Sequence, residues 1–316
     1  MVGTNAKVAV IGAGMAGLTC ARDLVRRGID VVVFDKGRGL GGRMATRRTQ
    51  DGFQFDHGVQ YVSSKGRALA AMLEQAENAK AVARWPKDRE GPAFVGVPGM
   101  TGLAKFLAGG LDIRKRVQIE RVLKSRGRWR LEWAEGHAEF DRVVVTTPAP
   151  QTSALLPRSH SFGDVLKTVT MDPCLTLMVG FAKKVPLPFE AHHAPSDDIS
   201  WLVCDSAKPG RPDTTCILAQ AGRDWSVRYL ERDKDEFAKL MLPLVADAIG
   251  ADLMVDPAYL SGHRWRYAFV SRSLGQPYLS DKEETLFAGG DWCLGAKVEH
   301  AWTSGQAIAA KIANGL

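Results

Sequence analysis

The sequence is poor in cysteine, and its cysteines follow no pattern in which they could act together. Among 316 residues there are five, without a Cys-x-x-Cys pair: Cys20, Cys174, Cys204, Cys216 and Cys293. An odd, scattered set predicts neither a disulfide framework nor a zinc site. We therefore expect no bound metal, and a reducing, cytoplasmic setting.

Long apolar runs are missing as well. The first apolar stretch is interrupted by three glycines within six residues, and only Lys7 lies before it as a basic residue. Signal peptides and spanning helices need an unbroken apolar segment, so we expect neither, and no membrane partner.

Long basic runs and nucleic-acid-binding motifs are also absent, although Lys and Arg (42) outnumber Asp and Glu (35). The resulting charge of +7 suits an anionic ligand and equally suits a solvated surface. We therefore expect no nucleic-acid partner. The apolar content of 45% is enough to build a substantial core.

What is present begins with a strand, a glycine-rich turn, a helix and a second strand. Lys7–Ile11 reads as a strand, Gly-Ala-Gly-Met-Ala-Gly follows at 12–17, helical spacing runs to Gly28, and the strand Ile29–Phe34 ends at Asp35. In this context the glycines allow a tight turn, close approach to a diphosphate and close helix–strand packing. The unit predicts a dinucleotide site in which helix amides hold phosphates and Asp35 binds ribose hydroxyls. The residues assigned to the turn are Gly12, Ala13, Gly14, Met15, Ala16 and Gly17.

The stretch 35–48, DKGRGLGGRMATRR, adds four glycines and five basic side chains directly behind this acid. A nicotinamide-binding domain needs nothing special there. The D-x5-GGR pattern resembles the second fingerprint of FAD-dependent amine oxidases and phytoene desaturases, which implies FAD in the Rossmann site. By this resemblance Lys36, Gly42, Arg43 and Met44 lie along the cofactor, with charge-assisted contacts from the arginine. Many FAD enzymes carry Glu where this chain has Asp35, so a nicotinamide nucleotide stays open as the alternative.

The segment FDHGVQY, residues 55–61, follows a predicted strand end. In the same enzyme group a glycine-containing segment at this point runs beside the flavin ring. The resemblance implies that Gly58, Val59, Gln60 and Tyr61 lie near that ring. The residues themselves are equally compatible with the edge of a strand.

Further along, a helix is predicted at 64–80, a hairpin around SRGR at 125–128, and a buried strand at 143–148. From about 155 the composition changes, with more prolines and repeated strand-like stretches. We predict an α/β protein with a Rossmann-like FAD-binding domain (1–75, 100–155 and 275–316). An inserted α+β substrate domain (76–99 and 156–274) completes the two-domain architecture of amine oxidases.

A strand at 285–288, a Gly-Gly-Asp-Trp turn and a helix at 303–313 end the sequence. A glycine pair and a carboxylate before a helix start can hold a ligand's ribitol and phosphate region. We assign Gly290, Asp291, His300 and Ala301 to the cofactor. A plain turn before an amphipathic helix is the alternative.

The ordered motifs GAGMAGL, DKGRGLGGRM, FDHGVQY, VPGM, VVVTTPAP, MDPCLTLMVGF, HRWRYA and GGDWCLGAKVEHAWTSG closely resemble bacterial renalases over almost the full length. The combination of MDP, HRWRYA and GDWC is the specific part. The resemblance implies a flavin oxidase of the 2- and 6-dihydro isomers of NAD(P)H. Such an enzyme returns NAD(P)+ and passes the electrons to O2 as hydrogen peroxide. It also implies Val117 near the adenine, and Thr147 and Pro148 near the FAD backbone.

This chemistry needs no dedicated acid or base, because a dihydropyridine becomes aromatic when it loses a hydride. Stacking against the flavin and exclusion of water suffice. The candidates for aromatic walls are Tyr61, Trp265, Trp292 and Trp302. His263 is the candidate for orienting the nicotinamide carboxamide or ribose, although a histidine there is also compatible with a structural role.

No flavin-linkage motif is present, so we expect noncovalent FAD. Two other functions stay open. One is an amine oxidase or desaturase on the same scaffold, and the other is a flavin-binding protein without catalysis.

Overall fold

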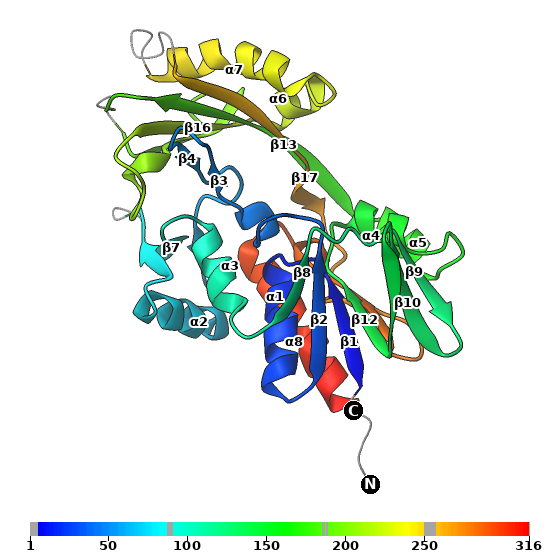
Figure 1. Cartoon of the computed structure of the whole chain (residues 1–316). Helices are drawn as coiled ribbons and strands as arrows, with labels where there is room; N and C mark the ends of the chain where they lie inside the picture. Colours follow the sequence, from blue (N-terminus) through cyan, green and yellow to red (C-terminus); the bar gives the residue numbers. More distant parts are fainter. Residues whose placement is uncertain (1–5, 87–90, 185–186, 188, 250–256, 316) are drawn as a thin grey trace. The chain divides into compact units, whose positions relative to one another are not determined.

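The computed structural model describes residues 6–86, 91–184, 187, 189–249 and 257–315, which form two compact units (Figure 1). Unit 1 consists of Met1–Gly42, Ala104–Met171 and Val270–Leu316. Unit 2 consists of Arg43–Leu103 and Asp172–Phe269. The sequence-based boundaries assigned residues 43–75 to the FAD-binding domain, whereas the structure groups them with unit 2.

A six-stranded sheet forms the centre of unit 1, in the order β18-β19-β12-β1-β2-β8. Its neighbours pair in parallel from β19 to β8, and β18 pairs antiparallel. Continuous apolar runs in β1, β2 and β12 suit a parallel sheet that is covered on both faces. The strands are β18 (Leu279–Ser280), β19 (Leu286–Ala288), β12 (Arg142–Val145), β1 (Lys7–Ile11), β2 (Asp30–Asp35) and β8 (Asp112–Lys115).

Helices α1 (Met15–Arg26) and α8 (Val298–Asn314) lie side by side in unit 1 (Figure 1). A Cβ atom on Gly305 of α8 would lie 2.3 Å from the Ala16 carbonyl oxygen of α1. Only glycine permits this distance, so the residue allows the two helices to pack closely.

An antiparallel sheet of β9 (Arg121–Ser125), β10 (Arg128–Trp133) and β11 (Gly136–Phe140) packs on the central sheet of unit 1. Every second residue of the central strands joins a core with this sheet, because side chains alternate between the faces of a strand. Members of this core include Ile11, Phe34, Val145, Trp129 and Phe140. The short helices α4 (Ala149–Leu155) and α5 (Phe162–Lys167) follow β12.

Unit 2 contains a five-stranded sheet in the order β14-β15-β16-β13-β17. Apolar residues of this sheet share a core with Trp225 of α6 (Arg223–Arg228) and Phe237 of α7 (Lys234–Ile249). The strands are β13 (Thr170–Phe181), β14 (Ala191–His193), β15 (Ile199–Cys204), β16 (Thr215–Ala221) and β17 (Tyr259–Arg272). The first two residues of β13 and the last three of β17 belong to unit 1.

The rest of unit 2 is made of short elements. One small sheet consists of β3 and β4, and another has the strand order β5-β7-β6. They comprise β3 (Arg47–Arg48), β4 (Gln54–Phe55), β5 (Val62–Ser63), β6 (Val82–Arg84) and β7 (Ala93–Gly96). Helix α2 (Arg67–Asn78) and the single turns η1 (Gly42–Met44) and η2 (Asp205–Ala207) accompany them, and helix α3 (Thr101–Leu107) begins in unit 2 and belongs to unit 1 from Ala104 on.

Most of the predicted helices and strands recur. Strand β7 lies in a segment for which no element was predicted. HRWRYA lies inside the long strand β17, which continues from unit 2 into unit 1 at Val270. The last helix begins at Val298, five residues before the expected start. Within the described residues, no helix has the length and apolar character needed to cross a bilayer.

Candidate functional site

The glycine-rich turn of unit 1 leaves open space in front of helix α1. Gly14 is the N-cap residue of α1, which has no side-chain cap and no acidic residue in its first turn. A Cβ on Gly14 would meet nothing within 4 Å, whereas a Cβ on Gly17 would lie 1.9 Å from the Gly12 oxygen. Gly17 is therefore needed for packing, while Gly14 leaves room for an anionic ligand at the helix amides.

The carboxylate of Asp35 connects this turn to the glycine-rich loop after β2. Its Oδ2 accepts from the Ala13 amide at 2.7 Å, and its Oδ1 accepts from the Gly37 amide at 2.6 Å. The Gly41 amide in turn donates to the Ala13 oxygen at 2.9 Å. Loop and turn are thus held in one arrangement. Each carboxylate oxygen keeps a lone pair for a ribose hydroxyl.

The other predicted residues of unit 1 gather at the same edge of the central sheet. Parallel strands bring their carboxyl ends to one edge, where ligands of such sheets bind. Thr147 and Pro148 follow β12, and the Gly289 amide behind β19 donates to the Val145 oxygen at 3.0 Å. Gly290 and Asp291 come next, and His300 and Ala301 lie in the first turn of α8.

Val117 lies beside this edge, because its amide donates to the Asp35 carbonyl oxygen at 3.0 Å. Lys36 and Gly42 are exposed along the loop. Met44 differs, since its side chain is only 2% exposed. A cofactor contact from Met44 would therefore have to come from its backbone.

These residues of unit 1 fit FAD. An open glycine at uncapped helix amides suits the diphosphate, and a carboxylate at the end of β2 suits the ribose. The glycine-rich chain behind β19 and the start of α8 offer further amides at the same edge.

In unit 2, a row of aromatic side chains lines one face of β17. Tyr259, His263 and Trp265 are two or four residues apart, so they share that face. The ring of Tyr259 stacks on Phe55 at 5.4 Å. His57 stacks on Trp265 at 5.2 Å and meets His263 edge-on at 4.5 Å.

Trp265 supports the chain at His57 and Gly58. Its indole N–H donates to the His57 oxygen at 2.7 Å, and a Cβ on Gly58 would lie 3.2 Å from its ring. That Cβ would also lie 2.0 Å from the Arg43 oxygen, which accepts from the Val59 amide at 2.8 Å. The Arg43 guanidinium donates to the Ala268 oxygen of β17 at 2.8 Å. Gly58 is therefore required where these three chain segments meet.

Both histidines of this row are neutral at physiological pH. Burial lowers the pKa of His263 to about 3, and His57 and the Arg47 charge add to the effect. Burial lowers the pKa of His57 to about 4, again with a contribution from Arg47.

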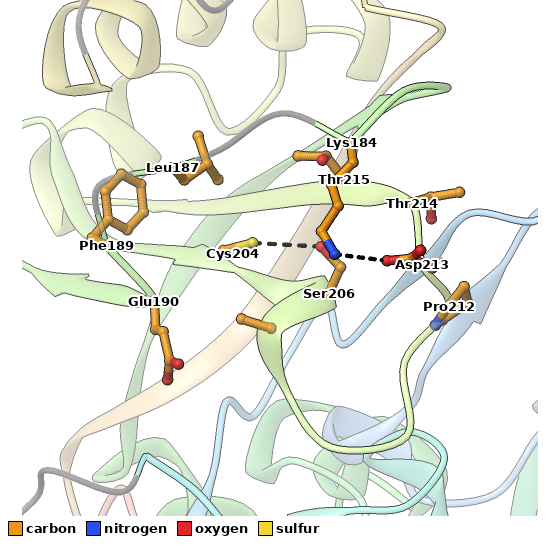
Figure 2. Close-up of a pocket in the computed structure, with 11 residues that line it drawn as sticks. Lys184, Leu187, Phe189, Glu190, Cys204, Ser206, Pro212, Asp213, Thr214 and Thr215 are labelled. Carbon is orange, nitrogen blue, oxygen red and sulfur yellow. Dashed lines mark hydrogen bonds and ion pairs between the residues drawn. The ribbon is translucent and has the colours of Figure 1, made fainter.

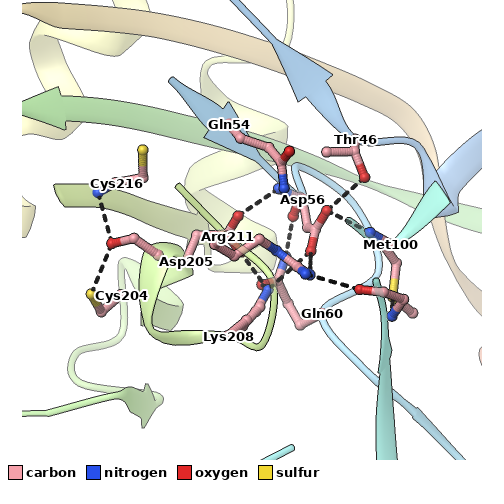
Figure 3. A network of polar contacts seen from close by, with 12 residues as sticks. Thr46, Gln54, Asp56, Gln60, Met100, Cys204, Asp205, Lys208, Arg211 and Cys216 are labelled. Carbon is pink, nitrogen blue, oxygen red and sulfur yellow. Dashed lines mark hydrogen bonds and ion pairs between the residues drawn. The ribbon is translucent and has the colours of Figure 1, made fainter. Parts of the chain in front are cut away.

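A fully buried network of charges anchors the segment that carries Gly58 and Gln60 (Figure 3). Asp56, Lys208 and Arg211 have fully buried side chains, and Asp205 is buried with them. Arg211 donates to Asp56 Oδ2. Lys208 donates to Asp205 Oδ1 at 2.5 Å and to the Gln60 side-chain oxygen at 3.0 Å.

Within this network two acidic and two basic side chains face one another, and the remaining acceptors of Asp56 are used. Asp56 accepts from the Thr46 hydroxyl at 2.7 Å and the Met100 amide at 2.8 Å. Burial alone would raise the pKa of Asp56, but Lys208 and Arg211 outweigh it and lower that pKa. Burial raises the pKa of Asp205, although Lys208 acts against it.

Gln60 connects the buried network to the backbone at Gly58 through hydrogen bonds. Its amide donates to the Asp56 oxygen at 2.7 Å and to the Gly58 oxygen at 2.9 Å. The Gly58 oxygen also accepts from Gln220 at 2.7 Å. The predicted ring segment is therefore held by charges buried beneath it.

Two of the predicted aromatic walls lie in a core instead. Trp292 has no exposed surface, and its indole N–H donates to the Thr147 oxygen at 3.0 Å. Trp302 is 6% exposed. The expectation for Trp292 is corrected by its position, because a side chain without surface cannot stack on a substrate. Tyr61 and Trp265 are partly exposed, and Tyr61 lies 5.9 Å from the Trp201 ring.

Sequence reasoning missed Arg47, His57 and the charge network. One available signal was Asp56, a charge set between the apolar Phe55 and the motif His57-Gly58. Another was the alternation in HRWRYA, where rings and arginines take turns as on the two faces of a strand.

A cavity of about 420 Å³ lies elsewhere in unit 2 (Figure 2). It contains none of the predicted site residues, and an exposed ion pair of Lys184 and Asp213 lies at its border, with 3.0 Å between Nζ and Oδ1. It is therefore separate from the candidate site. Its lining includes Leu187, Phe189, Glu190, Cys204, Ser206 and Thr215.

The Rossmann-like unit and its open turn define a dinucleotide-binding protein, and sequence comparison gives its class. The pattern of the NAD(P)-binding Rossmann-like domain matches residues 10–76. That of the flavin containing amine oxidoreductases matches residues 84–313. The chain belongs to the flavin containing amine oxidoreductase family. The predicted fold class, a Rossmann-like domain combined with an amine-oxidase-like domain, is confirmed.

Similar solved structures support the fold. A protein assigned as a protoporphyrinogen oxidase from Exiguobacterium sp. 255-15 matches with a TM-score of 0.80 and 15% identity, covering 99% of this chain and 100% of that one. Cyclohexylamine oxidase from Brevibacterium oxydans IH-35A matches at 0.70 and 14% identity, covering 98% and 99%. At such identities only the architecture is shared.

A curated relative is similar over a short stretch. 4,4'-Diapophytoene desaturase of Staphylococcus aureus (strain Newman) is 46% identical over 56 residues, which are 18% of this chain and 11% of the desaturase. The chain thus spans only a small part of the curated relatives that it matches.

Gly14→Val is expected to give a folded protein that is nearly free of flavin. The new Cβ meets open space, so folding is undisturbed, but the side chain blocks approach to the helix amides. The absorbance of the purified variant and its melting temperature test this. Gly17→Ala is the counterpart: its Cβ would clash with the Gly12 oxygen, so its melting temperature should fall. A fully flavinated Gly14→Val would refute the assignment of the turn.

Arg211→Met is expected to lower the free energy of unfolding by roughly 3–5 kcal/mol, because Asp56 loses a buried partner. Denaturant titration measures this, and adding Asp56→Asn should recover part of the loss. Lys184→Ala, which breaks the exposed pair with Asp213, is the control and should unfold like the unaltered protein. Equal losses in the two single variants would contradict the role given to the buried network.

Acidification should destabilise the fold between about pH 6.5 and pH 4. Both histidines have a pKa below the ordinary 6.5, so in this range the unfolded chain binds protons that the folded chain does not. Above pH 6.5 they are neutral in both states and contribute no slope. Melting temperatures across this range test the point, and His57→Gln should flatten the dependence. An unchanged slope in that variant would count against the buried neutral pair.

Proposed function

We propose that this chain is an FAD-dependent oxidase of the 2- and 6-dihydro isomers of NAD(P)H. A dihydronicotinamide dinucleotide is the reducing substrate, and O2 is the electron acceptor. When bound, the flavin would accept the hydride and return two electrons to O2. The balance is one dihydro dinucleotide, one O2 and one proton giving NAD(P)+ and H2O2.

The observation that carries this proposal is the row of His57, His263 and Trp265 in unit 2. Its rings are aromatic, and both imidazoles are neutral at physiological pH. A flat dihydropyridine needs contact surfaces and the exclusion of water, and it needs no base to make it a hydride donor. An amine substrate must first lose a proton, for which two histidines of such low pKa are poor acceptors.

The residues divide as follows in this proposal. Unit 1 binds FAD noncovalently through the amides of the Gly12–Gly17 turn, Asp35, and the chain around Gly290. The candidates for contacts with the flavin ring are Gly58, Val59 and Gln60 of unit 2. His263 orients the carboxamide or ribose, and Tyr61 and Trp265 offer flat surfaces. The renalase-like motif set of the sequence supports the same choice.

A second candidate is an amine oxidase or desaturase. It is favoured by the family to which the chain belongs and by the stretch shared with the desaturase. That stretch covers 11% of the desaturase, so it carries little information about the substrate.

Anaerobic mixing of the flavinated protein with the 2- and 6-dihydro isomers should bleach the flavin band within seconds. Readmitted O2 should restore the band, with one H2O2 formed per donor. Cyclohexylamine and putrescine are the comparison donors and should leave the band unchanged. Bleaching by amines alone would favour the second candidate, and a flavin unmoved by every donor would point to binding without catalysis.

A further inference from the structure

The short strand pair of β3 and β4 brings a guanidinium to the histidine row of unit 2. Arg47 pairs with Phe55, two residues before His57. Its Nη2 lies 3.4 Å from His263 Nδ1. A guanidinium can only donate, so Nδ1 of the neutral His263 must accept, and the ring proton is on Nε2. His263 therefore keeps an N–H donor beside a fixed positive charge.

The charge of Arg47 is not balanced by any ion pair among the described residues. In the part of the chain that the structure describes, no acidic side chain lies within ion-pair distance of Arg47. The neighbouring Asp56 is fully buried and bound by Arg211. On the other face of β17, Arg266 pairs with both oxygens of Glu231, at 2.6 and 2.9 Å.

A second observation points to a ligand at the same place. The Nδ1 atom of His57 is buried and makes no hydrogen bond of normal geometry within the described chain, although the Phe55 backbone lies close enough to raise the pKa of the ring against the effect of burial. The rings beside it are fixed, because Trp265 stacks on His57 and donates to its carbonyl oxygen. Arg47, His57 and His263 are thus held in place, and they can still form hydrogen bonds with a ligand.

We propose that Arg47 and His263 form a subsite for an anionic oxygen group, a phosphate or a carboxylate, of the reducing substrate, so that the His263 N–H contacts this group in place of the carboxamide. Guanidinium binds both groups through charge-assisted hydrogen bonds, and the His263 N–H adds a second donor. The same charge repels a protonated amine. This inference rests on the proposed function, whose substrate carries a phosphate on the ribose next to the nicotinamide.

The test measures how tightly the flavinated protein binds oxidised ligands that differ by one group. Nicotinamide riboside carries no anion, nicotinamide mononucleotide adds a phosphate, and nicotinic acid riboside adds a carboxylate. Calorimetric titration should show mononucleotide binding tighter than riboside by about ten- to hundredfold. Added salt should weaken the mononucleotide and leave the riboside unchanged.

Arg47→Met should bring the mononucleotide and the riboside to near equality, and Arg47→Lys should keep part of the difference. Arg48→Met is the matched control, because Arg48 is the exposed neighbour on the same strand and should leave the difference intact. Flavin content and melting temperature check that each variant is folded. If only the affinity for nicotinic acid riboside depends on Arg47, the group recognised is a carboxylate.

Equal binding of all three ligands, or an unchanged difference in Arg47→Met, would overturn the subsite. This failure is separable from failure of the proposed function. Reduced nicotinamide mononucleotide that bleaches the flavin equally well in the unaltered protein and in Arg47→Met leaves the oxidase standing without the subsite. A phosphate preference that depends on Arg47, in a protein that no dihydronicotinamide reduces, leaves the subsite standing without the oxidase.

Discussion

The two hydrogen bonds that the Asp35 carboxylate accepts are the constraint on which the candidate cofactor edge depends. One comes from Ala13 in the turn before α1 and the other from Gly37 in the loop after β2. Glycine-rich backbone has many conformations, and ordering it costs free energy. A carboxylate that bridges both segments selects one arrangement. In that arrangement the space in front of Gly14 stays open.

In unit 2 buried charges hold the glycine-containing backbone in place. The chain around Gly58 has little secondary structure, but the Gly58 carbonyl oxygen accepts hydrogen bonds from the side chains of Gln60 and Gln220. Lys208 holds Gln60, and Asp205 holds Lys208. Such a network is expensive to bury but specific in geometry, because every charge has a fixed partner. Both units thus fix glycine-containing backbone by means of carboxylates.

Local patterns in the sequence were sufficient to predict much of unit 1. The first strand, the glycine turn, the helix and the second strand follow from residues close together in the chain, and parallel pairing brings Asp35 and Gly290 to one edge. The site of unit 2 could not be predicted in this way. Arg47 and His263 are 216 residues apart, and Arg211 and Asp56 are 155 apart. The prediction for Trp292 was wrong because the local sequence around a tryptophan does not distinguish a buried core residue from one that contacts substrate.

The alternation along β17 restricts how this protein can change. Tyr259, His263 and Trp265 lie on one face only because successive residues of a strand point to opposite sides. Inserting or deleting a single residue between Tyr259 and His263 would exchange the faces. Arg264 and Arg266 would then replace the rings next to His57. Substitutions can therefore alter this strand one position at a time, whereas length variation is confined to the turns at its ends.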